Sequence, residues 1–174
     1  MKRILLLTML LFCMLILTSC TKGNTDMFFL DEDNNLADKR MEQLYEALEQ
    51  SNEKEIKKIF SKNAISKAEN IDNSIENLFL FIKGKVISWN RDESPIVFDS
   101  VKDIGETKQI VTWYSLQTDE QQYLFLLVDY PIDTISPNNA GVYSLGVLKL
   151  EDEDKLTGTL EDWIIPGIHF FEGN

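Results

Sequence analysis

The chain has 174 residues, 17 of them basic and 29 acidic, so its formal net charge at pH 7 is −12. Nucleic-acid binding is disfavoured by this balance, because phosphates are contacted mainly by Lys and Arg. Direct electrostatic attraction to anionic lipid headgroups is disfavoured for the same reason. The length predicts one domain beyond any targeting segment, with a core large enough to need no disulfide or metal.

The N-terminus has the pattern of a bacterial secretion signal. Lys2 and Arg3 precede an apolar run over residues 4–17, interrupted only by Thr8. The run is too short to span a bilayer well and is followed at once by polar residues, which favours cleavage. The sequence over residues 17–20, Leu-Thr-Ser-Cys, resembles the lipobox of bacterial lipoproteins. This resemblance implies cleavage before Cys20 and lipid attachment to its thiol.

A lipidated Cys20 predicts a protein tethered to the extracytoplasmic face of the cell membrane. Two or more acyl chains give a stable anchor, whereas one chain binds only marginally. The expected organisation is a signal peptide over residues 1–19, a tether over 20–35 and one domain over 36–174. Loss of Lys2 and Arg3 leaves 15 basic and 29 acidic residues, a mature net charge of −14. The other cysteine, Cys13, lies in the signal, so no disulfide is expected.

Three helices are predicted in the first half of the domain. The first, beginning near Leu36, is indicated by an apolar stripe at helical spacing, Met41, Leu44, Tyr45 and Leu48. The second covers about residues 53–61. The third covers 71–82, with Asn70 or Asp72 as the expected cap and Gly84 as the expected stop.

After Gly84 the apolar period changes from helical to alternating, and turn residues recur. The predicted strands are 85–89, 96–104, 109–116, 123–130 and 142–150, with a short one over 163–165. Residues 123–130 are apolar on both faces apart from Asp129, which indicates a central strand. Helices followed by antiparallel strands predict an α+β fold with the N-terminal helices packed on a curved sheet.

Three short motifs carry a family resemblance: GKVISW at residues 84–89, GVYSLGV at 141–147 and WIIPGI at 163–168. With the order of elements, they resemble the cystatin-like fold of the nuclear-transport-factor-2 and SnoaL type over residues 36–171. More narrowly, the chain resembles a family of small uncharacterised surface lipoproteins of Gram-positive bacteria. The resemblance implies a cone between concave sheet and helices where related folds hold ligands. It carries over no catalytic residue.

Metal and cofactor sites are not predicted. Asp31, Asp33, Asn35 and Glu42 follow the spacing of a calcium loop, but Leu36 occupies the position that requires glycine. A solvated acidic helix start explains these residues better. With His169 as the only histidine and no free cysteine, two-histidine zinc sites and Cys-His dyads are excluded. His169 is expected to be a packed or solvated tail residue, and no glycine cluster forms a nucleotide loop.

The candidate ligand pocket consists of Trp89, Trp113, Tyr123 and Asp129, since aromatic walls with one convergent polar group are typical of small-molecule sites. Trp113 rather than Tyr114 is expected to face the helices, because Ile110, Thr112, Tyr114 and Leu116 form the longer set on the opposite face. Asp129 would be a desolvated carboxylate there, with a raised pKa. The alternatives are a strand-end aspartate that reaches water or caps the following turn, and aromatic residues that simply belong to the core.

These features predict a non-enzymatic, membrane-tethered binding or envelope-accessory module, whose partner is a small ligand or an envelope protein. One alternative is a SnoaL-type hydrolase or isomerase with Asp129 as general base. Another is a structural homodimer formed through the sheet face.

Overall fold

The computed structural model describes residues 25–171, and their side chains from Asp31 onward. The chain divides into two compact units, Met1–Glu32 and Asp33–Asn174. Of the first unit the structure describes only the start of a helix. The predicted signal peptide and Cys20 lie outside the described residues. No helix in the described part of the chain is long and apolar enough to cross a membrane.

Four helices precede the sheet: α2 (Thr25–Glu49), α3 (Glu53–Ile59), α4 (Lys62–Lys67) and α5 (Ile71–Phe81). The side chains of Asn52, Ser61 and Asn70 cap α3, α4 and α5, each accepting a hydrogen bond from a backbone N–H of the first turn. The predicted Asn70 cap is therefore confirmed.

Helix α2 differs from prediction at its start. It begins at Thr25 instead of near Leu36, so residues 25–35 of the predicted tether are helical. Residues 31–33 therefore lie about two turns inside the helix, beyond the first turn in which the helix dipole favours negative charge. The expected solvated acidic helix start is wrong, since Asp33 is 7% exposed and pairs with Lys108. The apolar stripe of the sequence marks only where α2 packs on the domain, not where the helix begins.

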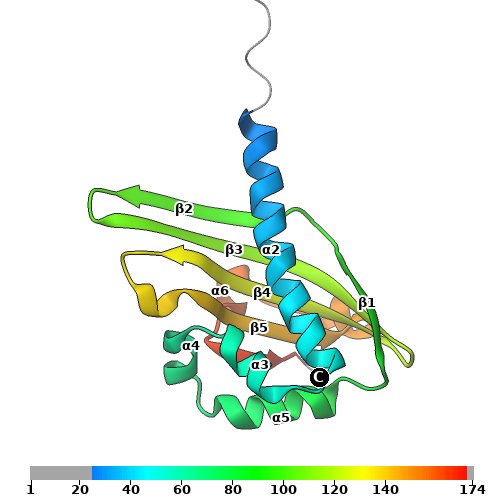
Figure 1. Cartoon of the computed structure of the whole chain (residues 1–174). Helices are drawn as coiled ribbons and strands as arrows, with labels where there is room; N and C mark the ends of the chain where they lie inside the picture. Colours follow the sequence, from blue (N-terminus) through cyan, green and yellow to red (C-terminus); the bar gives the residue numbers. More distant parts are fainter. Residues whose placement is uncertain (1–24, 172–174) are drawn as a thin grey trace, which may run out of the picture. The chain divides into compact units, whose positions relative to one another are not determined.

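The sheet contains six strands, β1 (Val86–Arg91), β2 (Ile96–Lys102), β3 (Gly105–Thr118), β4 (Gln122–Asp133), β5 (Gly141–Lys149) and β6 (Gly167–Phe170). The strand order is β1-β3-β4-β5-β6, and β2 also pairs with β3. One edge of the long strand β3 carries β2 along its first half and β1 along its second half. All pairs are antiparallel except β5 with β6 (Figure 1).

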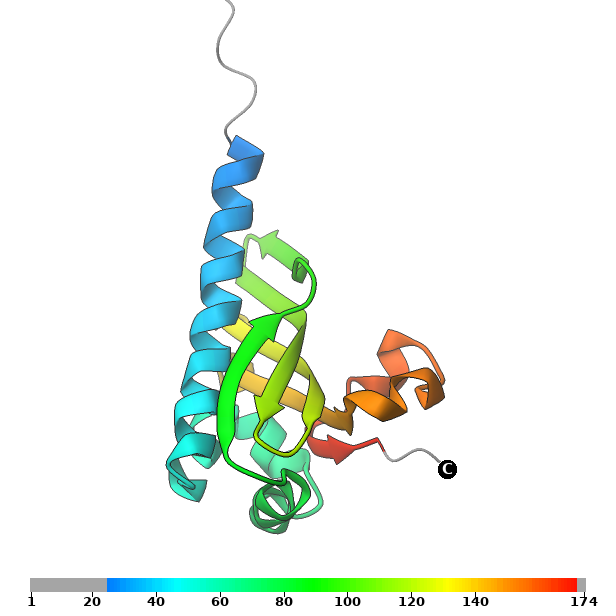
Figure 2. The ribbon, with the colours of Figure 1, turned by 90° about the vertical axis from the view of Figure 1, so that its right-hand side faces the viewer.

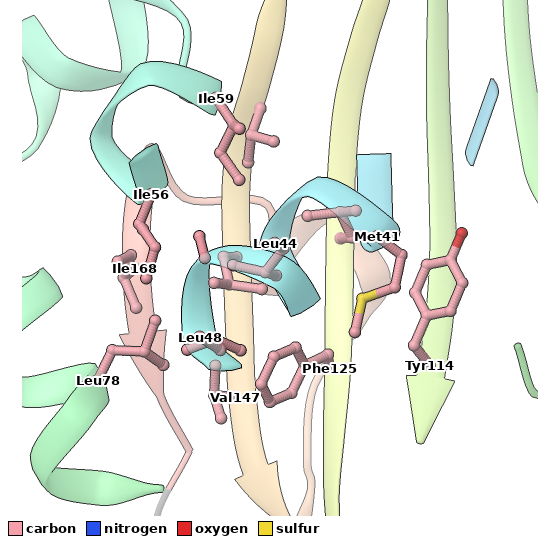
Figure 3. Close-up of a cluster of buried hydrophobic side chains, with 14 of the residues drawn as sticks. Met41, Leu44, Leu48, Ile56, Ile59, Leu78, Tyr114, Phe125, Val147 and Ile168 are labelled. Atoms are coloured by element: carbon pink, nitrogen blue, oxygen red, sulfur yellow. The ribbon is translucent and has the colours of Figure 1, made fainter. Parts of the chain in front are cut away.

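One face of the sheet, here called the helix face, packs against α2 from Asp33 onward and against α3 to α5. Met41, Leu44 and Leu48 of α2 point toward Phe125 of β4 and Val147 of β5 (Figure 3). Met41, Leu44, Phe125 and Val147 are all 0% exposed. Each such side chain contributes about 1.5–3 kcal/mol by leaving water.

The opposite face, here called the far face, is partly covered by the chain between β5 and β6. This segment contains the 3₁₀ helix η2 (Leu150–Lys155) and the short helix α6 (Leu160–Trp163). Leu160, Trp163 and Ile164 pack on a second cluster formed by Val111, Leu126 and Val128. Figure 2 shows this orange segment on the side of the sheet away from α2.

The predicted α+β class, with N-terminal helices on a curved and mostly antiparallel sheet, is confirmed, and the architecture is compatible with a cone-like fold. The predicted strand over 163–165 is wrong, because Trp163 ends α6 and the last strand is β6. Thr159 and Asp162 form a capping box that starts a helical turn in this segment. His169, expected in the tail, belongs to β6.

Candidate functional site

Asp129 is the main polar group on the helix face. It lies where the pairing of β4 with both neighbouring strands is irregular. The residue is 3% exposed, and its Oδ1 accepts a hydrogen bond of 2.9 Å from Nε of Arg40 on α2. Burial raises the pKa of the Asp129 carboxyl, against the lowering effect of the Arg40 guanidinium. The strand-end alternative, a carboxylate reaching water, is wrong.

Trp89 and Tyr123 also lie on the helix face, where both make structural contacts. The Tyr123 hydroxyl donates to the carbonyl of Phe81 and accepts from the backbone N–H of Lys83, so it satisfies the end of α5. Trp89 packs edge-on against Tyr114, with ring centroids 5.6 Å apart. Its indole N–H donates to Glu42 of α2.

Trp113 does not lie on the helix face with Trp89 and Tyr123, so its predicted orientation is wrong. It packs on the far face with Val111, Leu126 and Val128, while Tyr114 is 0% exposed in the helix-face core. The longer apolar set of β3 faces the helices, because these bury more of the sheet than the segment after β5 does. Trp113 and Asp129 therefore lie on opposite faces, and the four predicted residues do not line one pocket.

The space between helices and sheet, where the sequence resemblance predicted a ligand-binding cone, is occupied by side chains in the described part of the chain. Met41, Leu44, Tyr114 and Phe125 are each fully buried there (Figure 3), and so is Leu116. Protein interiors are close-packed, so these contacts form a core and not a pocket wall.

A groove of about 520 Å³ lies on the far face instead. Its floor comes from strands, through Trp113, Ser115 and Leu124, and its other side from the segment after β5. The nine described lining residues are Asp92, Glu93, Trp113, Ser115, Leu124, Leu150, Glu153, Leu156 and Trp163. We call this the far-face groove.

Two tryptophans form the aromatic part of the groove. The rings of Trp113 and Trp163 meet edge to face, with centroids 5.8 Å apart and planes at 76°. The indole N–H of Trp163 donates to the carbonyl of Thr157 at 3.0 Å, which fixes that ring. Aromatic pairs of this geometry are favourable beyond the area that they bury. The groove therefore has an ordered aromatic wall.

The charged groups lining the groove are all acidic. Asp92, Glu93 and Glu153 are exposed at its rim. Oδ1 of Asp92 accepts a hydrogen bond of 2.7 Å from the hydroxyl of Ser115 on the groove floor. The arrangement combines apolar surface, two indoles and negative charge in one hollow.

The residues considered for a calcium loop and for catalysis have other contacts. Asp33 lies within α2 and pairs with Lys108 at 2.5 Å. Nε2 of His169 lies 2.9 Å from the carbonyl oxygen of Ile165. Within residues 31–171, no group of three or more His, Cys, Asp or Glu side chains is arranged to hold a metal ion.

Sequence reasoning missed most of this groove. The sequence predicts Trp113 as a pocket residue but on the wrong face, and it places Trp163 in a strand. The alternation of side chains along β3 could have indicated the groove. Val111, Trp113 and Ser115 point to the second face of this strand and are less polar than the residues of a solvent-exposed face. The contributions of Glu153 and Leu156 depend on how the segment after β5 folds back, which no local pattern shows.

A protein-family profile described as "Domain of unknown function (DUF5104)" matches residues 43–150. The match includes the strand floor of the groove but ends before Glu153, Leu156 and Trp163. No curated protein matches the chain.

Proposed function

Since the chain belongs to the family of the domain of unknown function DUF5104, we propose its function from its own residues. The protein is a membrane-tethered, extracytoplasmic lipoprotein that acts as a non-enzymatic binding module. Its ligand site is the far-face groove. The observation that carries the proposal is this hollow of about 520 Å³, lined by two tryptophans, within the size range of small-molecule sites.

Support for the tether comes from the N-terminal sequence. The order of a basic start, an apolar run and Leu-Thr-Ser-Cys over residues 17–20 is that of a lipoprotein precursor. The fold type we propose is the cystatin-like one of the nuclear-transport-factor-2 kind, which the helices on a curved sheet support.

Support for binding over catalysis comes from Asp129. A general base must lie within hydrogen-bond reach of a substrate proton. Asp129 instead lies under α2, with a side chain 5% exposed and bonded to Arg40. A substrate would have to displace that helix to reach it.

The tether is tested by fractionating cells that express the wild-type chain or Cys20→Ala, with a labelled fatty acid in the medium. The wild-type protein should be labelled and membrane-bound, and the variant unlabelled and released. A wild-type protein that takes up no labelled fatty acid, together with a Cys20→Ala variant that stays in the membrane, would contradict the anchor.

The binding site is tested with a panel of cationic, neutral and anionic fragments on the mature Cys20→Ala chain, followed by NMR. Ser115→Phe fills the groove floor, and Ser88→Phe, at an exposed serine of β1, is the matched control. Binders should lose affinity in Ser115→Phe alone. If no fragment binds, or if binding survives Ser115→Phe, the groove is not the ligand site.

A further inference from the structure

The lining of the far-face groove also indicates the charge of its ligand. Resting on the function proposed above, we infer that the groove binds a small organic cation with an apolar body, such as an arylalkyl or alkyl ammonium compound. Three features carry this inference: the sign of the charges, the paired indoles and the leucine walls.

The charges at the groove have one sign. Asp92, Glu93 and Glu153 line it, and no lysine or arginine is among its described lining residues. The closest basic residues in sequence have acidic partners of their own. Lys155 pairs with Asp152 at 2.6 Å, and Lys149 lies 3.9 Å from Glu151.

Arg91, next to Asp92 in sequence, is directed away from the groove. Its guanidinium contacts Asp38 of α2 at 2.8 Å, on the helix face. Three rim carboxylates and a mature chain with 15 basic and 29 acidic residues, a net charge of −14, therefore set a negative potential over the groove. An anionic ligand would be repelled there.

The paired indoles suit a cation as well. An ammonium group within about 6 Å of an indole face is attracted by the ring quadrupole. Trp113 and Trp163 are held by mutual contact, and Trp163 also by its bond to Thr157, so little ordering is needed on binding. The rim carboxylates line the same groove as the two indole rings, so one cation could contact a carboxylate and an indole at the same time.

The remaining walls require an apolar portion in the ligand. Leu124, Leu150 and Leu156 line the groove, and Leu124 is only 6% exposed. Leu124 is therefore already packed, whereas a fully hydrated metal ion would leave the exposed apolar surface of the half-buried Leu150 and Leu156 uncovered. The volume of about 520 Å³ fits one small molecule.

The test uses three probes with the same apolar body and different charge: 2-phenylethylammonium, 2-phenylethanol and 3-phenylpropanoate. Dissociation constants are measured by calorimetry on the full mature Cys20→Ala chain at low and high salt. The ammonium should bind about tenfold more tightly than the alcohol, from cation–π and carboxylate contacts together. The propanoate should bind most weakly, and the preference should shrink in high salt.

A triple variant, Asp92→Asn with Glu93→Gln and Glu153→Gln, should reduce the preference for the ammonium to about threefold or less, leaving the indole contribution. The matched control neutralises three exposed glutamates on the helical side, Glu49, Glu69 and Glu76, and should keep the tenfold preference. Both variants keep side-chain size, and circular dichroism checks that they fold.

Equal or tighter binding of the alcohol or propanoate would overturn the inference about charge, while a groove that binds neutral fragments would leave the proposed function intact. Absence of binding by all three probes would also overturn the inference that the groove binds a cation. The fragment panel with Ser115→Phe tests the proposed function separately. A lysine-containing peptide that binds the groove more tightly than the ammonium would show that the partner is a protein.

Discussion

The ion pair of Arg40 and Asp129 gives the sharpest prediction about stability. The bond is 2.9 Å long, with Asp129 side-chain exposure of 5% and Arg40 exposure of 21%. Removing one partner of a fully buried pair costs about 3–5 kcal/mol, because the other charge is left uncompensated. Since Arg40 is partly exposed, we expect Arg40→Met to lower the free energy of unfolding at pH 7 by about 2–4 kcal/mol.

This cost should depend on pH. Burial raises the pKa of Asp129 above its ordinary value of 3.8. The stability that comes from keeping this carboxyl protonated is therefore fully present below pH 3.8 and is lost as the pH rises through the pKa of the folded state. Arg40 opposes this loss by favouring the carboxylate. Without Arg40 the pKa of Asp129 rises further. Arg40→Met should therefore cost little near pH 4 and progressively more toward pH 7.

Urea unfolding at pH 4, 5.5 and 7 measures the effect on Arg40→Met, Asp129→Asn and the double variant. In the Asp129→Asn background the cost of Arg40→Met should no longer vary with pH, because the titrating group is gone. Asp129→Asn alone should cost less than Arg40→Met at pH 7, since the Arg40 charge left behind still reaches water. A cost of Arg40→Met below about 0.5 kcal/mol, the range of surface substitutions, or a cost that is equal at all three pH values, would contradict a stabilising buried ion pair.

Three further predictions concern the core and are measured by the same unfolding experiment. Leu44→Ala, at a fully buried position, should cost about 2–5 kcal/mol, and Leu80→Ala, at a residue 66% exposed, should stay within about 0.5 kcal/mol; equal costs would contradict the assigned core. Gly141→Ala should cost about 1–3 kcal/mol, because φ is +116° and the new Cβ would lie 2.9 Å from a backbone oxygen. Gly158→Ala, at φ +106° with only side chains nearby, should cost less. Tyr123→Phe should cost about 1–3 kcal/mol by leaving the two backbone groups at the end of α5 unpaired.

The order of helices and strands could be predicted from periodicity, since each element buries one apolar face. The Asn70 cap predicted the start of the third helix. The continuous apolar run over residues 123–130 predicted the central strand, and β4 is buried on both faces there. The start of α2 could not be predicted in this way. Residues 25–35 lack a continuous apolar stripe, and intrinsic propensity is a weak guide without packing.

The faces of β3 show why the candidate site could be predicted only in part. Alternation correctly separates Trp113 from Tyr114, but it does not say which set faces the helices. Which set faces the helices depends on whether the helices or the segment after β5 cover more of the sheet, and in this protein both faces are at least partly covered. The segment after β5 covers the far face through contacts distant in sequence, such as Trp163 on Trp113.

The most direct test of the far-face groove as the binding site uses the three tryptophans as reporters. Trp113 and Trp163 line the groove, whereas Trp89 lies on the helix face with its indole N–H bonded to Glu42. A titration of the mature chain with 2-phenylethylammonium, followed by the indole N–H signals, should shift those of Trp113 and Trp163 and leave that of Trp89 unchanged. A shift of Trp89 alone would place the ligand between helices and sheet, and would contradict the account.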